Sequence, residues 1–334
     1  MKKLMLSVAV FGLLQGCGSE SSDNEIPEMS KGTLSIGISD SPMHSMQKVQ
    51  LEFHRFHYTD ASGVEHQHQM SGVQMNLMDY RGMDRHMVID QLNLPAGQYH
   101  NGYFEMVEGD GNQGCYVDNG TGRHGLHLEN DRIHLGDFEV RAGDHHRMTI
   151  EMDLYRGLHG SDQHHQGYHF HQDASYSVAD NHMGHLIGEV DPQWVEDCET
   201  KNSANGALDS NFGHMAYLYP AEVSSIEKMA DISGERNDGR IAPIATAPVF
   251  QDHNDDWHFH MGFLPKGEYR VGYTCLAHFD DASVDDIASG RFEMEQDAGS
   301  VVVNTGENGG HQNVMTCGNG HRGGGHGGHG GHGG

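Results

Sequence analysis

LPAGQY at residues 94–99 returns as LPKGEY at residues 264–269, a spacing of 170 residues. Each copy places a Pro-x-Gly turn before a segment that opens with tyrosine. Proline fixes φ in such a turn, and glycine accepts conformations that other residues resist. Four identities stand at the same positions in both copies, and a strand-like run follows each. The repeat therefore predicts two related β-sandwiches, with one such turn in each.

Alternating apolar and polar residues mark the expected strands. The pattern is clear in residues 33–38 and 148–154, where the apolar side chains fall on one strand face. Turns rich in Gly, Asp and Asn separate these segments, and no long amphipathic helix is predicted. We expect an all-β chain of two antiparallel β-sandwiches, Ig-like or prealbumin-like, because residues 186–190 read as a new first strand. The predicted sandwiches span residues 32–185 and 186–317.

The N-terminal residues predict export and lipid attachment. Two lysines precede an apolar run over residues 4–14, which is shorter than the roughly 20 residues that a membrane-spanning helix needs. Leu14-Gln15-Gly16-Cys17 then forms a lipobox. We expect residues 1–16 to be a signal peptide, Cys17 to carry the lipid, and residues 17–31 to be a flexible tether, since they are small, polar and acidic.

The residues that follow the predicted lipid favour the outer membrane. Gly18 and Ser19 come directly after Cys17, with no aspartate of the kind often associated with retention in the inner membrane. The lipid is the expected membrane contact, on either the periplasmic or the outward-facing side.

The excess of acidic over basic side chains limits the kinds of molecule that the protein is expected to bind. The chain has 48 acidic and 20 basic side chains and a formal charge of −28, which becomes −30 when the two lysines of the signal peptide are removed. Nucleic acid is excluded as a partner, because its binding depends on Lys and Arg displacing counterions. The 29 histidines, with an ordinary pKa near ~6.5, make the net charge strongly dependent on pH.

The cysteines predict disulfide bonding. Once Cys17 carries lipid, four remain: Cys115, Cys198, Cys275 and Cys317. An even number in an exported chain suggests disulfides, and four cysteines allow three connectivities. Cys198 with Cys275 is the preferred pair, because both fall in the second predicted sandwich. No CxxC motif is present, so neither a thioredoxin-like motif nor a zinc-ribbon pair is available.

The glycine-rich C-terminal tail, residues 318–334, is the first candidate metal site. It contains His321, His326, His329 and His332, the last three in the spacing HGGHGGH. Neutral imidazole is a good ligand for Zn, Ni and Cu, and glycine lets the backbone wrap several rings around one ion. The alternative is a disordered low-complexity tail with incidental affinity. The chain requires no cofactor in either case.

Histidines two residues apart give further candidates. His169 and His171 form one such pair, and His258 and His260 form another. Residues two apart on a strand project from the same face, so each pair could chelate an exposed ion. The intervening Phe259 would then point into the core. The alternative interpretation is that these histidines are solvated surface residues.

Enzyme signatures are absent from the sequence. No HExxH, GxSxG or Walker A motif occurs. Residues 109–114 match GxGxxG, but a strand-like Cys115-Tyr116-Val117 follows where a dinucleotide-binding fold requires a helix. We therefore predict a protein that is not an enzyme and has no catalytic residues.

Six segments carry a family resemblance: Gly32-Thr33-Leu34, Asp40-Ser41-Pro42, the alternating Val49-Leu51-Phe53, Leu77-Met78-Asp79, Leu94 to Tyr99, and Met148 to Leu154. Together they resemble the DUF4382 family of bacterial exported lipoproteins over residues 32–185, with Ser41 where alanine is expected. The resemblance implies a β-sandwich at the cell envelope and brings no assigned activity. Through Leu264 to Tyr269, the second part resembles carboxypeptidase-regulatory-like or transthyretin-like sandwiches.

These observations give three ranked hypotheses for function. The first is a non-enzymatic cell-envelope lipoprotein, a binding or structural module that captures or buffers divalent transition-metal ions through its histidines. The second is a surface adhesion or matrix-interaction protein without a specific metal role. The third is a metal-dependent hydrolase, which the lack of a compact ligand set with a neighbouring general base disfavours. No particular protein or glycan partner follows from the sequence.

Overall fold

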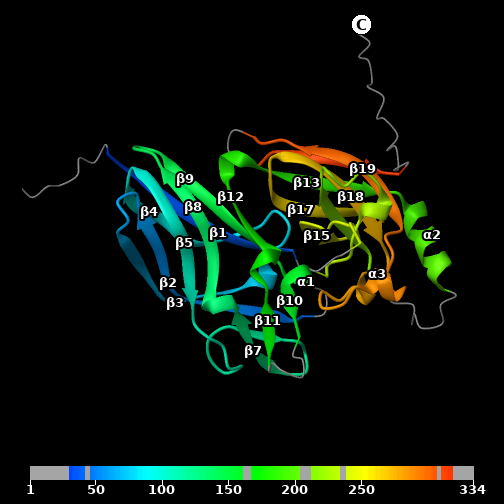
Figure 1. Ribbon diagram of the computed structural model, residues 1–334, viewed down its shortest axis with the longest axis horizontal. Helices are drawn as coiled ribbons and strands as arrows, with labels where there is room; N and C mark the ends of the chain where they lie inside the picture. The colour runs from blue at the N-terminus through cyan, green and yellow to red at the C-terminus, as the bar shows by residue number, and fades with distance from the viewer. Residues whose placement is uncertain are drawn as a thin grey trace, which may run out of the picture.

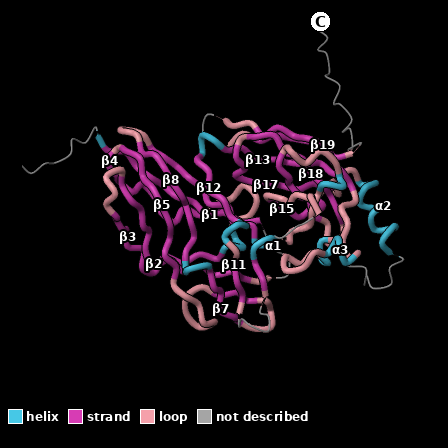
Figure 2. Tube along the Cα trace, in the orientation of Figure 1, coloured by secondary structure: helices cyan, strands magenta, loops and turns pink. Residues whose placement is uncertain are grey.

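The computed structural model describes residues 30–41, 46–160, 167–203, 212–233, 238–306 and 310–318. These residues form an all-β structure of four sheets with three short α-helices. Two sheets lie on the left in Figure 1 and two on the right, with the helical turn α1 between them. Figure 2 shows how strands dominate both halves. Within the described residues, no helix is long and apolar enough to cross a membrane.

The first half consists of a four-stranded and an eight-stranded sheet. The smaller sheet has the order β12-β9-β1-β4, and the larger runs β10-β11-β7-β6-β2-β5-β8, with β3 paired to β2. The strands of the smaller sheet are β1 Lys31–Ser41, β4 His86–Pro95, β9 His145–Asp153 and β12 Ser175–Ala179. Those of the larger sheet are β2 Lys48–Asp60, β3 Glu65–Asn76, β5 Gly97–Met106, β6 Tyr116–Asp118, β7 Arg123–Leu128, β8 Arg132–Val140, β10 Leu158–His159 and β11 Tyr168–Phe170.

The second half consists of two four-stranded sheets, ordered β16-β17-β13-β20 and β15-β14-β18-β19. Its strands are β13 Met183–Val190, β14 Met215–Pro220, β15 Ala245–Pro248, β16 Phe250–Gln251, β17 Trp257–Pro265, β18 Gly267–Thr274, β19 Gln296–Val303 and β20 Gln312–Cys317. The predicted boundary between residues 185 and 186 falls inside β13, and the division into domains stays a prediction.

Short helices connect the strands. The α-helices are α1 Leu154–Gly157, α2 Pro192–Ser203 and α3 Asp286–Ser289. The 3-10 turns are η2 Leu77–Asp79, η3 Glu129–Asp131, η4 Gln172–Ala174, η5 Asp180–His182, η6 Ile226–Lys228 and η7 Ala277–Phe279.

The two halves share a strand arrangement that explains the sequence repeat. In each, a central strand pairs antiparallel with the strand that ends in the repeated proline, and parallel with a strand from later in the chain. β1 lies between β4 and β9, and β13 lies between β17 and β20. Gly32 faces Leu94 across the first pair, and Gly184 faces Leu264 across the second. The predicted all-β fold is thus confirmed, but each half also contains parallel strand pairs.

The repeated hairpin turn is closed by its tyrosine in both halves. Tyr99 donates from its hydroxyl to the carbonyl of Pro95 at 2.7 Å, and Tyr269 donates to Pro265 at the same distance. Both rings are buried, at 3% and 8% exposure, so the hydroxyl needs this internal acceptor. Burial raises the pKa of Tyr99 to about 12. The turn and the first residue of the next strand are therefore fixed together.

The helix α2 was not predicted, although its signals are present. Pro192 begins the helix, and the Asp191 carboxylate accepts from the backbone N–H of Gln193 at 2.9 Å. Val195 and Cys198 are buried, three residues apart on one helix face. Because residues 192–203 are mostly polar, this narrow apolar stripe is difficult to recognise in the sequence.

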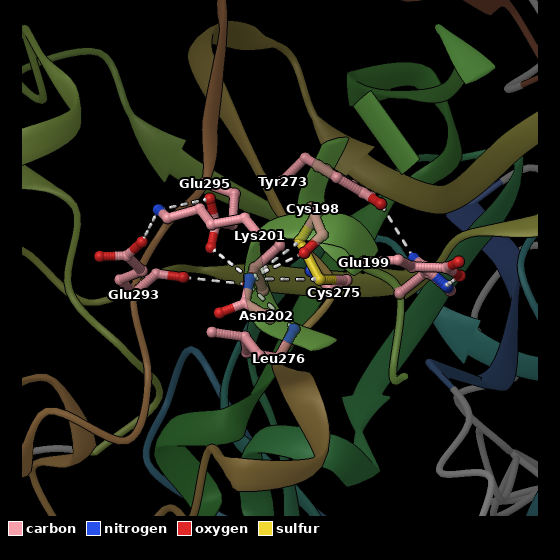
Figure 3. Close-up of a disulfide and its surroundings, with 11 residues drawn as sticks. Cys198, Glu199, Lys201, Asn202, Tyr273, Cys275, Leu276, Glu293 and Glu295 are labelled. Carbon is pink, nitrogen blue, oxygen red and sulfur yellow. Dashed lines mark hydrogen bonds and ion pairs between the residues drawn. A yellow bond between two sulfur atoms is a disulfide. The ribbon is translucent and has the colours of Figure 1, made fainter. Parts of the chain in front are cut away.

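A disulfide ties α2 to the end of β18 (Figure 3). Cys198 and Cys275 are bonded, with Cα atoms 6.1 Å apart, so the preferred pairing of the sequence analysis is confirmed. Asn202 donates from its amide to the carbonyl of Cys198 at 2.9 Å and to Glu295 at 2.8 Å. Lys201 pairs with Glu295 at 2.9 Å, so the helix end is held to the sheet by polar contacts as well.

The turn α1 joins the two halves. Tyr155 belongs to the hydrophobic core of the second half, where its hydroxyl donates to the carbonyl of Ala277 at 2.6 Å and lies 3.0 Å from the hydroxyl of Tyr217. On one side of it, Asp153 accepts from the backbone N–H of Thr246 at 2.8 Å. On the other side, Arg156 donates to the carbonyl of Ile244 at 2.7 Å. Three residues of the first half, Asp153, Tyr155 and Arg156, thus contribute an apolar contact and several hydrogen bonds to the second.

Buried carboxyl groups lie beside this junction. Asp40, Glu151 and Asp153 are 0%, 4% and 1% exposed, and all three line a small cavity that also contains Thr246 and His260. Burial, followed by the charges of neighbouring carboxylates, raises the pKa of Asp40 and of Glu151 well above their usual range. Burial also raises the pKa of Asp153, but the charge of Arg156 and the hydrogen bonds from Arg156 and Thr246 oppose that rise, so Asp40 and Glu151 are the groups shifted most strongly toward the protonated form.

The first prediction concerns the tyrosine-closed turns. Tyr99→Phe and Tyr269→Phe should each lower the free energy of unfolding by about 1 kcal/mol, because the carbonyl of the turn proline loses its hydrogen-bond donor. Urea denaturation followed by tryptophan fluorescence measures this. Tyr103→Phe is the control, because Tyr103 is a partly exposed tyrosine of the same strand as Tyr99 and contacts His57 through its ring. Equal stability of the Tyr99→Phe and Tyr103→Phe variants would contradict the assignment.

The second prediction concerns the pH dependence that Glu151 creates. Above pH ~4.3 the unfolded state loses the proton that the folded state keeps, so this group lowers stability increasingly as pH rises, by up to about 1.4 kcal/mol per pH unit. Glu151→Gln should flatten this decline and raise stability more at pH 8 than at pH 5. Denaturant titrations at both pH values measure it, with the exposed Glu268→Gln as control. A larger gain at pH 5 would overturn the prediction.

Candidate metal-binding histidine pairs

Several predicted site residues lie outside the described residues. These are the tail histidines His321, His326, His329 and His332, together with the predicted lipid-bearing Cys17. The structural account of the site therefore concerns the histidines of the folded part.

His258 and His260 lie together on β17. Their rings are 5.2 Å apart between centroids and stacked at 15°, with Phe250 of the neighbouring strand β16 edge-on to both. Phe259 between them is fully buried, as the alternation predicted. Burial, followed by the charge of His258, lowers the pKa of His260. The expected same-face pair is present, and its metal binding stays a prediction.

His169 and His171 do not pair with each other, which corrects the sequence analysis. β11 ends at Phe170, so the strand rule does not extend to His171. His169 stacks on His127 of the parallel neighbour β7, with ring centroids 5.0 Å apart. His171 instead lies edge-on to His159 of β10, at 4.4 Å. Two cross-strand pairs replace the one predicted pair, and the sequence analysis did not identify His127 and His159 as partners.

The His127 side of this arrangement faces a broad cavity. The cavity has a volume of about 770 Å³ and is lined by Glu108, His124 and His127 together with glycine-rich backbone. The Nδ1 of His127 lies 3.8 Å from a carboxylate oxygen of Glu108. His124 is turned edge-on to Tyr168. Two imidazoles, those of His124 and His127, and two carboxylates, those of Glu108 and Asp110, thus line this cavity.

The His159 side faces a second cavity, at the junction of the two halves. This cavity has a volume of about 430 Å³, and the first half contributes Arg156, His159, His171, Asp173 and Ala174 to its wall. The second half contributes the remaining lining residues, Ile232, Ser233, Ala242, Ala282, Ser283 and Asp285. The helical turn α1 and the short strand β10 that follows it bring His159 to this place.

The electrostatics of the junction cavity keep His159 available as a ligand. Burial is the main cause that lowers the pKa of His159, and the neighbouring His171 lowers it further, whereas the carboxylate of Asp281 opposes both. A lowered pKa leaves the imidazole neutral, the form that binds metal, to a more acidic pH.

No complete metal centre is present among the described residues. No group of three or more His, Cys, Asp or Glu side chains in this part of the chain is arranged to hold a metal ion. Structural zinc sites use four protein ligands and catalytic zinc sites three. The folded part therefore presents pairs of imidazoles, which leave most coordination positions to water or to a side chain that moves.

The remaining candidate disulfide cysteines are not bonded, which corrects their assignment. Cys115 and Cys317 are both free and buried. They belong to the cores of different halves, so they cannot meet. Burial raises the pKa of each thiol to about 12, so both are protonated at neutral pH and are poor nucleophiles or ligands.

One contact between serine, histidine and aspartate has a structural explanation. The Ser35 hydroxyl lies 2.7 Å from Nε2 of His145 and 3.2 Å from a carboxylate oxygen of Asp90. It also accepts from the backbone N–H of Gln91 at 2.9 Å, at the bulge where β4 slips against β1 and Gln91 adopts φ 54°. Ser35 is fully buried, so the hydroxyl supports the bulge and is out of reach of a substrate.

Comparison with protein families adds one finding. Residues 31–171 match the family described as a domain of unknown function, DUF4382. The matched range includes strands β1 to β11. It also includes His127, His159, His169 and, as its last residue, His171. The resemblance stated from the sequence is thus supported for the first half. No curated protein matches the sequence.

Comparison with solved structures gives only distant likenesses. A candidate adhesin from Bacteroides ovatus is 8% identical, with a TM-score of 0.19, over 90% of this chain and 94% of that one. A candidate cell adhesion protein from Bacteroides fragilis is 8% identical, with a TM-score of 0.19, over 85% and 92%. The major pilin of Streptococcus pyogenes is 10% identical, with a TM-score of 0.14, over 86% and 98%. At these TM-scores the likenesses carry no argument about function.

The third prediction tests the electrostatics of the junction pair. In a pH titration followed by NMR of the histidine rings, His159 should titrate below the ordinary value of ~6.5. His171→Ala should raise its pKa, because the variant removes both a like charge and part of the burial. His258→Ala, in a different pair, is the control. If His159 titrates above the ordinary value, or if the two variants act alike, the described geometry is wrong.

Proposed function

We propose that this chain is a non-enzymatic lipoprotein of the cell envelope that binds divalent transition-metal ions through histidine pairs and its histidine-rich tail. The observation that carries the proposal is the pairing of six histidines in the folded part: His127 with His169, His159 with His171, and His258 with His260. Imidazole nitrogen selects Zn, Ni and Cu over Mg and Ca. Two imidazoles at each place make a partial site for such an ion.

The incomplete ligand sets argue for capture or buffering rather than permanent retention. A pair of imidazoles leaves room for water, so ions bind and leave readily, in contrast to closed four-ligand sites. The formal charge of −28 adds a general attraction for cations. Cation binding at several reversible sites is the behaviour expected of a metal buffer.

The lipobox supports the proposed location. Cys17 would hold the protein to the membrane, most simply the outer membrane, with the two halves and then the tail extending from it. Capture of ions on the periplasmic or outer side would follow from that placement. An adhesion or matrix-interaction role is the alternative, and it requires no metal.

Titration calorimetry with Zn²⁺, Ni²⁺ and Cu²⁺ tests the proposal. The full chain should bind several ions, and replacement of the four tail histidines by asparagine should remove the tightest class while weaker binding persists in the folded part. Binding should decline as pH falls through ~6, since protons compete for the same nitrogens. The control is a free peptide with the sequence HGGHGGH.

Two results would contradict this function. One is binding by the full chain no tighter than binding by the free peptide. The other is loss of all binding in the tail variant, which would exclude the folded pairs as ligands. The first result would favour the adhesion alternative, whereas the second would restrict metal binding to the tail.

A further inference from the structure

The outer face of the larger sheet carries two rows of polar side chains, away from the histidine pairs. Strands β3, β2, β5 and β8 are neighbours in this sheet, in the left half of Figure 1. Phe56, Phe104 and Ile133 of these strands are buried in the core, so the residues that alternate with them face solvent. The strand register places these residues in two rows across the strands: Gln69, Arg55, Glu105 and Arg132 in the first row, and Gln67, His57, Tyr103 and His134 in the second.

The two rows are basic, although the chain as a whole is acidic. They combine two arginines and two histidines with the single carboxylate of Glu105, whereas the whole chain has 48 acidic and 20 basic side chains. His54 adds a further imidazole, whose Nε2 lies 4.0 Å from Glu105. Glu105 also pairs with Arg55 at 3.3 Å and with His57 at 2.7 Å, so several basic groups share its charge. The rows therefore offer positive charge to a ligand.

Arg132 is the cationic group best placed to meet that ligand. Its side chain is exposed, and its guanidinium carbon lies 4.3 Å from the centre of the Tyr103 ring. Tyr103 is stacked in turn on His57, with ring centroids 4.7 Å apart and ring planes at 6°. The side-chain amide of Gln172 donates to the carbonyl of Arg132 and accepts from the backbone N–H of His134 at 3.4 Å, which supports the strand. A cation–π contact thus orients the guanidinium before a ligand arrives.

Acidic residues bound the basic rows at both ends. Glu52 lies before Arg55 on β2, whereas Glu65 on β3 and Asp137 on β8 lie toward the opposite end of the face. A broad anionic surface such as a bilayer would meet these carboxylates and the remaining surface of a chain with charge −28. A thin acidic chain can instead lie along the two rows alone.

The uncharged side chains of the rows suit a carbohydrate. The amides of Gln67 and Gln69 are exposed, and each both donates and accepts hydrogen bonds, as sugar hydroxyls do. The Tyr103 hydroxyl adds a donor and an acceptor between the basic groups. Guanidinium groups, in contrast, match the planar geometry of a carboxylate. Both kinds of group are needed to recognise a sugar chain that carries carboxylates.

We infer that this basic face binds a short segment of an acidic polysaccharide. Arg55 and Arg132 pair with uronate carboxylates, while Gln67, Gln69 and Tyr103 bind sugar hydroxyls. The basic face is defined by these five residues with His57 and His134. The inference goes beyond the proposed metal binding and does not depend on it.

Biolayer interferometry with immobilised polygalacturonate, and with the full chain and EDTA in solution, tests the inference. EDTA removes metal ions that could bridge the protein and the polysaccharide. The full chain should bind polygalacturonate and should not bind highly methyl-esterified pectin, whose carboxyl groups are neutral. Binding should weaken as NaCl rises from about 50 mM to about 0.5 M, because salt screens exposed charges.

Two substitutions with opposite effects locate the site. Arg132→Gln should weaken binding about fivefold, because it removes one exposed contact between opposite charges. Glu105→Gln should strengthen binding about threefold, because it removes the carboxylate that repels an anion within the rows. Loss of folding would not produce that gain, so the pair of variants is informative even if one of them is less stable.

Arg141→Gln is the matched control for the loss of charge. Arg141 is exposed and follows the last residue of β8, about 30 Å along the strand from Arg132. This separation exceeds the distance over which exposed charges act at about 0.1 M salt. The control variant should therefore bind within about twofold of wild type.

Three results would overturn the inference. The first is equal binding to polygalacturonate and to methyl-esterified pectin, or binding to neither. The second is an equal effect of Arg132→Gln and Arg141→Gln. The third is binding to phosphatidylglycerol vesicles that depends on Arg132 without binding to polygalacturonate, which would make the basic face a membrane contact. Because EDTA is present throughout, these results leave the proposed metal binding to be decided by calorimetry.

Discussion

The insertion of Tyr155 into the second core is the contact on which the arrangement of this molecule depends. The ring is 8% exposed and belongs to a core otherwise built from the second half. Its hydroxyl is satisfied by Ala277, so the side chain cannot leave without exposing both an apolar ring and an unpaired carbonyl. Asp153 and Arg156 bond to the second half on either side of it. Because β10 follows directly, the same turn fixes where His159 lies.

This junction combines contacts that stabilise it with groups that oppose it. Tyr155 and the Asp153–Thr246 hydrogen bonds hold the halves together, whereas Asp40 and Glu151 lie buried nearby with strongly raised pKa values. Protonated carboxyls are tolerated in such a place, but carboxylates are not, so the junction is weakest at alkaline pH.

Local features were predicted well from the sequence, but contacts between residues far apart in the chain were predicted poorly. The hairpin turns at Tyr99 and Tyr269 were readable because proline, glycine and tyrosine act within six residues. The burial of Phe259 followed from strand alternation, which is also local. The partners of His169 and His171 were not readable, because they depend on which strands become neighbours and in what register. The same limit applies to the parallel pairing of β1 with β9, whose residues lie more than a hundred positions apart.

Which histidines become neighbours depends on that strand register. In β7, β11 and β10, residues His127, His169 and His159 stand opposite one another across three neighbouring strands. Nevertheless the rings separate into two pairs, because β11 ends at Phe170 and His171 meets His159 beyond the strand. As a result, His127 lines the cavity of the first half, whereas His159 lines the cavity at the junction of the two halves. The wall of the shared cavity also contains Arg156, so the turn that inserts Tyr155 into the second core places His159 at the contact between the halves.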